Sequence, residues 1–253
     1  MIDNLKHVVE RWRPSDKDAR ETVHFLHIGK NAGTQIGDLV NQNPQEAHRP
    51  RVLVRDHDVR LRDLPTEDRY FFSIRRPAER FYSGFYSRKR CGRPRYDYPW
   101  SPYEAAAFAE FEHANELAES LFDAGPRGRQ AVAAIKSIQH TSTNQLDWFD
   151  RHGTFLEVRP PVFIVRTERF DTDVRELLDR LGYADLPVGG SRAHGNDYSG
   201  TPPLSERGRE NLERWYVQDA AFYDLCEAWI EAELGKRGAR GAGRAGRASP
   251  LTI

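Results

Sequence analysis

The stretch FLHIGKNAGTQI, residues 25–36, decides the fold that the sequence predicts. It begins inside a short apolar run, residues 23–28, which is typical of a buried strand, and it leads into helix-forming residues 34–40. A loop of small and polar residues lies between them. The main-chain N–H groups of such a loop, together with the N-terminus of the following helix, attract an anion. The pattern predicts an anion-binding βα unit, although an ordinary packing turn would have the same pattern.

Further strands and helices alternate along the chain. Short apolar runs predict strands at 51–54, 70–74 and 162–165. Pro77 suits the first turn of a helix, because its missing N–H is unpaired there in any case. We therefore expect an α/β fold with a central, mainly parallel sheet flanked by helices, and ligands bound where the strands end.

Helical patterns cover 103–122 and 170–181, and two more helices follow the loop at 187–203. The last of them has Asp219 as its expected N-cap. Residues 1–234 are predicted to form one domain. The Gly/Arg-rich tail, residues 235–253, carries five basic residues and no acidic ones, so we expect it to be disordered.

The composition excludes several classes of protein. Two cysteines are too few for a disulfide framework, which suits a reducing compartment. The N-terminus has no apolar signal region and no run is long enough to cross a membrane, so we expect a soluble, cytoplasmic protein. No pattern of metal ligands such as C-x-x-C or H-E-x-x-H occurs, and no metal is expected.

The loop at 29–34 does not have the G-x-x-x-x-G-K-[ST] pattern of nucleotide triphosphatases, because Lys30 is followed by Asn31. A second candidate anion site follows the strand at 70–74. Arg75 stands at the strand end, and Ser83 lies about 9 Å along the helix that begins at Pro77. A guanidinium and a hydroxyl at that spacing could hold one phosphate.

Together, HIGKNAGT (27–34) and SIRRPAERFYSGFY (73–86) resemble the two cofactor motifs of sulfotransferases that use 3′-phosphoadenosine 5′-phosphosulfate (PAPS). The chain is most similar to the carbohydrate branch, which includes the heparan sulfate 2-O-sulfotransferases. Weaker likeness covers residues 166–182, 194–199 and 216–226. The resemblance implies a P-loop-like three-layer α/β fold, a sulfuryl transfer to an acceptor hydroxyl, and a carbohydrate acceptor.

The resemblance also implies roles for single residues. Lys30 would contact the phosphosulfate and stabilise charge on its bridging oxygen. Arg75 and Ser83 would bind the 3′-phosphate, while Tyr198 and Ser199 would close over the nucleotide. The 5′-phosphate would be held by the five residues after the lysine, Asn31, Ala32, Gly33, Thr34 and Gln35. The motif departs from the family pattern at Gly29, Ala32, Gln35 and Arg76.

A sulfuryl transfer needs a base that removes the proton of the acceptor, and histidine titrates in the right range. His57, in RDHD (55–58), follows the second strand and lies at the predicted catalytic edge, with Asp56 or Asp58 to orient it. The resemblance supports the same residue. His140 is the second candidate.

The acceptor is expected along residues 87–100, where Arg88, Arg90 and Tyr96 could contact a sugar and its charges. A solvated helix end is the alternative for this segment. Two other functions stay open: a P-loop-type kinase, against which the missing GK[ST] argues, and a non-catalytic module that binds anions or nucleic acid through the tail. We expect no nucleic-acid partner, and the oligomeric state is not predicted.

Overall fold

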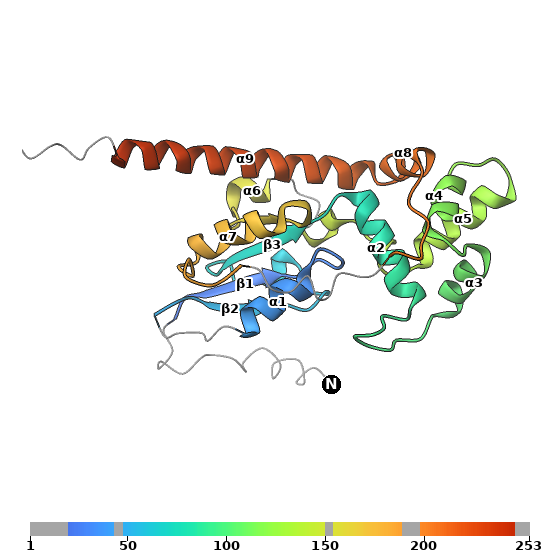
Figure 1. Ribbon diagram of the computed structural model, residues 1–253, viewed down its shortest axis with the longest axis horizontal. Helices are drawn as coiled ribbons and strands as arrows, with labels where there is room; N and C mark the ends of the chain where they lie inside the picture. The colour runs from blue at the N-terminus through green and yellow to red at the C-terminus, as the bar shows by residue number, and fades with distance from the viewer. Residues whose placement is uncertain (1–19, 43–47, 150–153, 189–197, 246–253) are drawn as a thin grey trace, which may run out of the picture.

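The centre of the computed structural model, which describes residues 20–42, 48–149, 154–188 and 198–245, is a four-stranded parallel sheet (Figure 1). Its strands are β1 (Thr22–Leu26), β2 (Arg51–Val54), β3 (Arg69–Ile74) and β4 (Ile164–Arg166). Their order is β2-β1-β3-β4, and each neighbouring pair is parallel. The predicted parallel sheet is confirmed, although β4 begins two residues later than expected.

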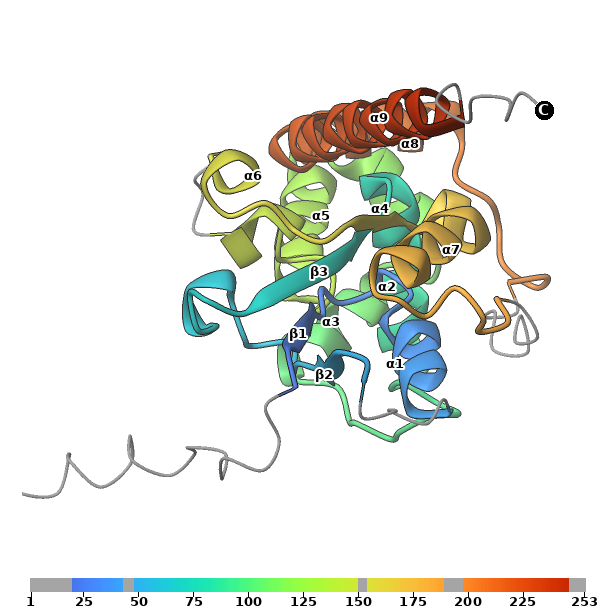
Figure 2. The ribbon, with the colours of Figure 1, turned by 90° about the vertical axis from the view of Figure 1, so that its left-hand side faces the viewer.

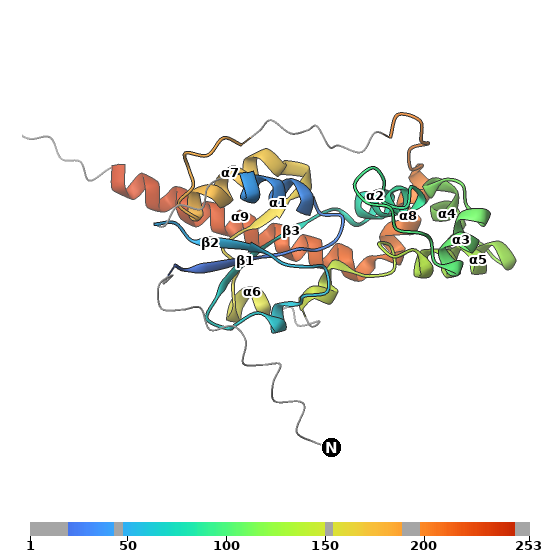
Figure 3. The same cartoon turned by 90° about the horizontal axis from the view of Figure 1, so that it is seen from below.

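Helices cover both faces of this sheet (Figure 2). Phe71 and Phe72 are neighbours in β3, so their side chains point to opposite faces. On the side of Phe71, apolar residues of α1 (Gly33–Gln42) and α7 (Phe170–Arg180) pack against the sheet. On the other side, Phe72 contacts rings from η2 (Gln145–Phe149), α6 (Phe155–Val158) and α9 (Val217–Ala245). The view in Figure 3 shows α1 and α7 on the opposite side of the sheet from α6. These residues form three layers.

A second apolar cluster lies beyond the carboxyl end of β3, at the right of Figure 1. It consists of α2 (Pro77–Lys89), α3 (Pro102–Glu110), α4 (Ala114–Ser120), α5 (Pro126–Ser137) and α8 (Glu206–Trp215). Helix α2 leaves the sheet directly after β3 and begins at Pro77, as the sequence predicts. Two single turns, η1 (Leu61–Asp63) and η3 (Thr167–Arg169), complete the described elements.

The region 103–122, expected as one helical stretch, is divided into α3 and α4. Phe111 is extended and fully buried between them, which ends α3. The carboxylate of Glu116 accepts hydrogen bonds from the N–H groups of Glu112 and His113, so it caps the start of α4. The break lets the ring of Phe111 enter the second apolar cluster.

Helix α9 differs from its prediction at both ends. It begins at Val217, so Asp219 lies within its first turn, and the Asp219 carboxylate binds N–H groups of η2 instead of capping its own helix. The helix continues to Ala245 and so includes part of the predicted disordered tail. Arg237, in that part, pairs with Glu176 and Asp179 of α7, which supports helical structure beyond Gly235. Residues 246–253 lie outside the described ranges.

None of the helices in the described ranges has both the length and the apolar character that a membrane crossing requires.

Candidate functional site

The loop between β1 and α1 contains two residues in the left-handed backbone conformation. Lys30 has φ 70° and Ala32 has φ 59°, so two non-glycine residues adopt the left-handed conformation with one residue between them. Such outliers cost of order 1–3 kcal/mol each and gather at ligand-binding turns. Runs of this type form concave groups of N–H donors. The loop then enters α1 at Gly33, which adds the positive end of the helix.

Gly33 is required here by a close approach. A Cβ atom on Gly33 would lie 1.7 Å from Nε2 of His27, so the imidazole of His27 occupies the place of a side chain. Burial, with smaller contributions from the charges of His57 and Lys30, lowers the pKa of His27 to about 3. His27 is therefore neutral near pH 7 and packs against the start of α1 without adding a charge.

Lys30 lies among other cations. It is half-buried, and burial together with the charges of Arg75, Arg90, Arg95 and Arg80 lowers the pKa of its ammonium group from 10.5 to about 8. A protein does not gain stability by gathering four arginines around one half-buried lysine. The arrangement becomes favourable when a ligand brings negative charge, so it points to an anion site.

The two predicted phosphate-binding sites, called grips below, are in contact: the first is the loop at Lys30, and the second is Arg75 with Ser83. Nη1 of Arg75 lies 3.4 Å from the main-chain oxygen of Lys30 and donates to it. On α2, Arg80 donates through Nε to the oxygen of Gly29 at 3.1 Å. Ser83 is buried and follows Arg80 by three residues, so it lies on the same side of α2 one turn further on. The structure therefore brings Lys30 and Arg75 into contact at this edge of the sheet, and Ser83 lies further along α2 on the side of Arg80.

The side chain of Asn31 does not face a bound phosphate, as the resemblance implied, but points into the protein. Its side chain is fully buried, and Nδ2 donates to the oxygen of Ser73 at 2.8 Å and to Oε1 of Gln145 at 2.6 Å. The hydroxyl of Ser73 donates to the main-chain oxygen of Asn31 at 2.5 Å. The Asn31 side chain thus holds the loop against β3, and a ligand would meet only its main chain. The side chains of Ala32, Thr34 and Gln35 are half-buried at the start of α1.

His57, the predicted base, is exposed on the loop that follows β2. Its Nδ1 lies 2.9 Å from the main-chain oxygen of His27, and the two rings are 4.0 Å apart between centroids. Since a carbonyl oxygen only accepts, Nδ1 must donate, and Nε2 of the neutral ring is left as the proton acceptor. The orienting group is the His27 carbonyl, in place of the predicted Asp56 or Asp58.

His140, the second candidate, also lies beside Gly29, and its ring centroid is 6.4 Å from that of His57. A Cβ on Gly29 would be 3.4 Å from Nδ1 of His140, and one on Gly84 would be 3.0 Å from its Cβ. Burial lowers the pKa of His140 to about 3, with Lys30 as the next cause. A base with so low a pKa accepts a proton poorly at neutral pH.

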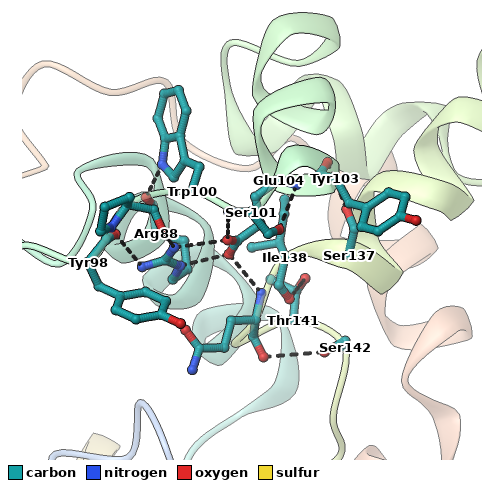
Figure 4. A network of polar contacts seen from close by, with 12 residues as sticks. Arg88, Tyr98, Trp100, Ser101, Tyr103, Glu104, Ser137, Ile138, Thr141 and Ser142 are labelled. Atoms are coloured by element: carbon teal, nitrogen blue, oxygen red, sulfur yellow. Dashed lines mark hydrogen bonds and ion pairs between the residues drawn. The ribbon is translucent and has the colours of Figure 1, made fainter.

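Arg88 does not line an acceptor surface, which corrects the expectation from the sequence (Figure 4). It is fully buried and binds Glu104 through Nε at 2.7 Å and through Nη2 at 2.9 Å. Burial alone would raise the pKa of Glu104, but hydrogen bonds from Arg88, Ser101 and Gln139 hold it at about 2. Since Glu104 also accepts from the N–H of Gln139, this ion pair ties α2 and α3 to the segment that carries His140.

Arg90 and Tyr96 lie in the segment that follows α2. Arg90 donates to the oxygen of Arg93 at 3.4 Å, and Tyr96 is 47% exposed. The ring of Tyr96 covers Gly92, whose φ is 86°. Arg95 pairs with Asp38 of α1 at 3.2 Å, which brings this segment beside the helix that follows the loop at 29–34.

Tyr198 and Ser199 are described, while residues 194–197 of the same motif lie outside the described ranges. The ring of Tyr198 packs against Tyr82 and Tyr86 of α2, with centroid distances of 5.1 and 5.9 Å. Tyr82 directly precedes Ser83, so Tyr198 lies beside the turn that carries this serine. Ser199 is exposed.

Three residues of the site have no counterpart in the prediction from sequence: His27, Arg80 and Gln145. His27 directly follows β1 and precedes Gly29 by two residues, so its position in the sequence could have identified it as part of the site. Arg80 lies one turn after Arg76 within the second motif. Gln145 is part of no pattern, since its place depends on contacts across the whole fold.

Within the described ranges, no three His, Cys, Asp or Glu side chains are placed to hold a metal ion. A comparison of the chain with protein-family models, with curated proteins and with solved structures found no match.

Proposed function

We propose that this protein is a PAPS-dependent sulfotransferase that modifies a hydroxyl group of a carbohydrate acceptor. The observation that carries the proposal is the meeting of two anion grips. The left-handed loop at Lys30 and Ala32 forms one, Arg75 and Ser83 belong to the other, and a contact of 3.4 Å joins them. A ligand with phosphate groups at two ends could bind one phosphate in each grip. The resemblance of the two motifs to those of sulfotransferases supports the same cofactor.

When bound, PAPS supplies the sulfuryl group, which passes to the acceptor oxygen as the bond to the bridging oxygen of the phosphosulfate breaks. Lys30 would stabilise the negative charge that remains on that bridging oxygen. The loop N–H groups and Thr34 would hold the 5′-phosphate, and Arg75 with Ser83 the 3′-phosphate. Positioning and charge stabilisation would supply most of the rate, as in phosphoryl transfer.

His57 is the proposed general base. Its Nε2 is the free acceptor of the neutral ring, and the proton of the acceptor hydroxyl would move to this atom. The low pKa of His140 argues for His57 over its neighbour. The same proposal includes two further points: the three-layer fold is of the P-loop-like type, and the protein is cytoplasmic.

Binding of adenosine 3′,5′-bisphosphate, measured by calorimetry, tests the proposal. We expect binding to the wild-type protein without added metal, weaker binding to Arg75→Ala, and transfer of labelled sulfate from PAPS to a panel of hydroxyl acceptors. Lys30→Ala should nearly abolish transfer. A wild-type protein that does not bind the bisphosphate would refute the scheme.

The role of His57 is tested separately. His57→Ala should keep bisphosphate affinity but lose transfer, because it removes only the proton acceptor. His140→Ala is the matched control, and it should keep more activity. Full transfer activity in His57→Ala would remove this residue as the base.

A further inference from the structure

Gln145, in the first turn of η2, has one of the densest sets of polar contacts near the site. Its side chain is fully buried. Oε1 accepts hydrogen bonds from Nδ2 of Asn31 at 2.6 Å and from the N–H of Arg75 at 2.9 Å. Nε2 donates to the main-chain oxygen of Arg75, also at 2.9 Å. One amide group therefore binds both the anion-binding loop and the residue that begins the second grip.

The two bonds to Arg75 continue the pattern of the sheet. β3 pairs with β4 only as far as Ile74 and Arg166, so the N–H and oxygen of Arg75 lie just past the last paired residue. The amide of Gln145 supplies the donor and the acceptor that a neighbouring strand would have supplied. Arg75 is thereby fixed at its main chain, although its side chain reaches into the site.

Asp219, in the first turn of α9, holds Gln145 in turn. Its Oδ1 accepts from the main-chain N–H of Gln145 at 2.6 Å, and its Oδ2 from Nε2 at 3.2 Å. Arg80 places Nη1 3.9 Å from the same carboxylate. Gln145 is therefore held by Asp219 of α9, which Arg80 of α2 approaches in turn, and it has little freedom to rotate.

We propose that Gln145 is a positioning residue that sets the distance between the two phosphate grips. This inference rests on the proposed function. Asn31 shares the loop with Lys30, and Arg75 belongs to the other grip, so the Gln145 amide binds both grips, in addition to the direct contact of the Arg75 side chain with the main-chain oxygen of Lys30. A ligand with two phosphates gains its full affinity only when both grips are at the right spacing before it binds.

Binding of four ligands distinguishes a change in the spacing of the two grips from a general loss of protein stability. The ligands are adenosine 3′,5′-bisphosphate, 5′-AMP, 3′-AMP and adenosine. Their dissociation constants give the factor by which one phosphate strengthens the binding of the other. The variants are Gln145→Ala and Gln145→Asn, the second of which keeps the amide on a shorter side chain. Ile230→Ala, in the core part of α9, is the control for a loss of stability.

We expect the coupling factor to fall about tenfold in Gln145→Ala, because a grip displaced by a fraction of an ångström no longer meets its phosphate. Affinity for each monophosphate should change less. Gln145→Asn should lie between this variant and wild type, and Ile230→Ala should keep the wild-type factor.

Equal losses for all four ligands in Gln145→Ala, which leave the coupling factor unchanged, would overturn the inference while the proposed function stands. A wild-type protein that binds none of the phosphate ligands would instead refute the proposed function. If Gln145→Ala does not fold, the comparison of Gln145→Asn with Ile230→Ala decides by the same factor.

Discussion

Raising the pH above 8 should weaken the binding of adenosine 3′,5′-bisphosphate to the wild-type protein. The cause is Lys30, whose pKa in the ligand-free site is about 8 because of burial and of the neighbouring arginines. An anion needs the charged form of this lysine. As the pH passes the pKa, a growing share of the free protein must first take up a proton before it binds.

The size of the effect follows from the titration. If only protein with a charged Lys30 binds, the fraction of ligand-free protein in this form falls from about nine tenths at pH 7 to about one tenth at pH 9. Affinity should therefore fall about tenfold over these two pH units, which is about 1.4 kcal/mol. Each further unit costs another factor of about ten until the pKa of Lys30 in the complex is reached.

Calorimetry at constant ionic strength measures this directly, and proton uptake on binding gives a second signal. Lys30→Arg is the matched control, because arginine keeps its charge over the whole range and should bind with a much flatter pH profile. Lys30→Met should bind weakly at every pH. An unchanged wild-type affinity between about pH 7 and pH 9 would refute the account in which a lysine that titrates near pH 8 holds the anion.

Stability should change with pH in the opposite direction. The pKa of Lys30 is lower in the folded chain than the ordinary value of 10.5, so the unfolded chain binds more protons between these values. The free energy of unfolding from this group therefore rises as the pH increases from about 8 to about 10.5. Below pH 8 the buried charge costs up to about 3 kcal/mol, and Lys30→Met should be more stable than wild type at neutral pH.

Two further predictions concern the supporting structure. Gly33→Ala should lose bisphosphate binding and lower the melting temperature, since its Cβ would lie 1.7 Å from Nε2 of His27. Gly37→Ala is the control in the same helix, because a Cβ there would have nothing within 4 Å, and it should keep both properties. Equal effects at the two positions would contradict this account. Arg88→Met should destabilise the protein by about 3–5 kcal/mol in denaturant unfolding, because it leaves the buried carboxylate of Glu104 unpaired. Arg88→Met combined with Glu104→Gln should recover part of that loss, and no recovery would show that the pair acts by packing alone.

Much of the sheet could be predicted, because apolar runs report burial directly. β1, β2 and β3 are short apolar segments bounded by polar residues, and Pro77 marks the start of α2. The meeting of the loop with Arg75 also follows from the sequence, since parallel strands place their carboxyl ends at one edge. These inferences need only local patterns and the topology of a parallel sheet.

The burial of charged groups could not be predicted in the same way. Arg88 stands in a run of basic residues that is typical of a solvated surface, yet its partner Glu104 lies in another helix. Asp219 has the sequence position of a helix cap, but its carboxylate is used by Gln145 across the fold. The site roles of Lys30, Ser83, Tyr198 and His57 remain predictions.

The length of α9 has a practical consequence. This helix of 29 residues spans about 40 Å. Its first turn holds Gln145 beside the carboxyl ends of the strands, while its last turns lie at the far end of the molecule in Figure 1. A dye or a surface tether attached near Ala245 would stand well away from the loop at Lys30. Immobilisation through this end should therefore leave ligand access unchanged, which suits surface-based binding assays of the variants described above.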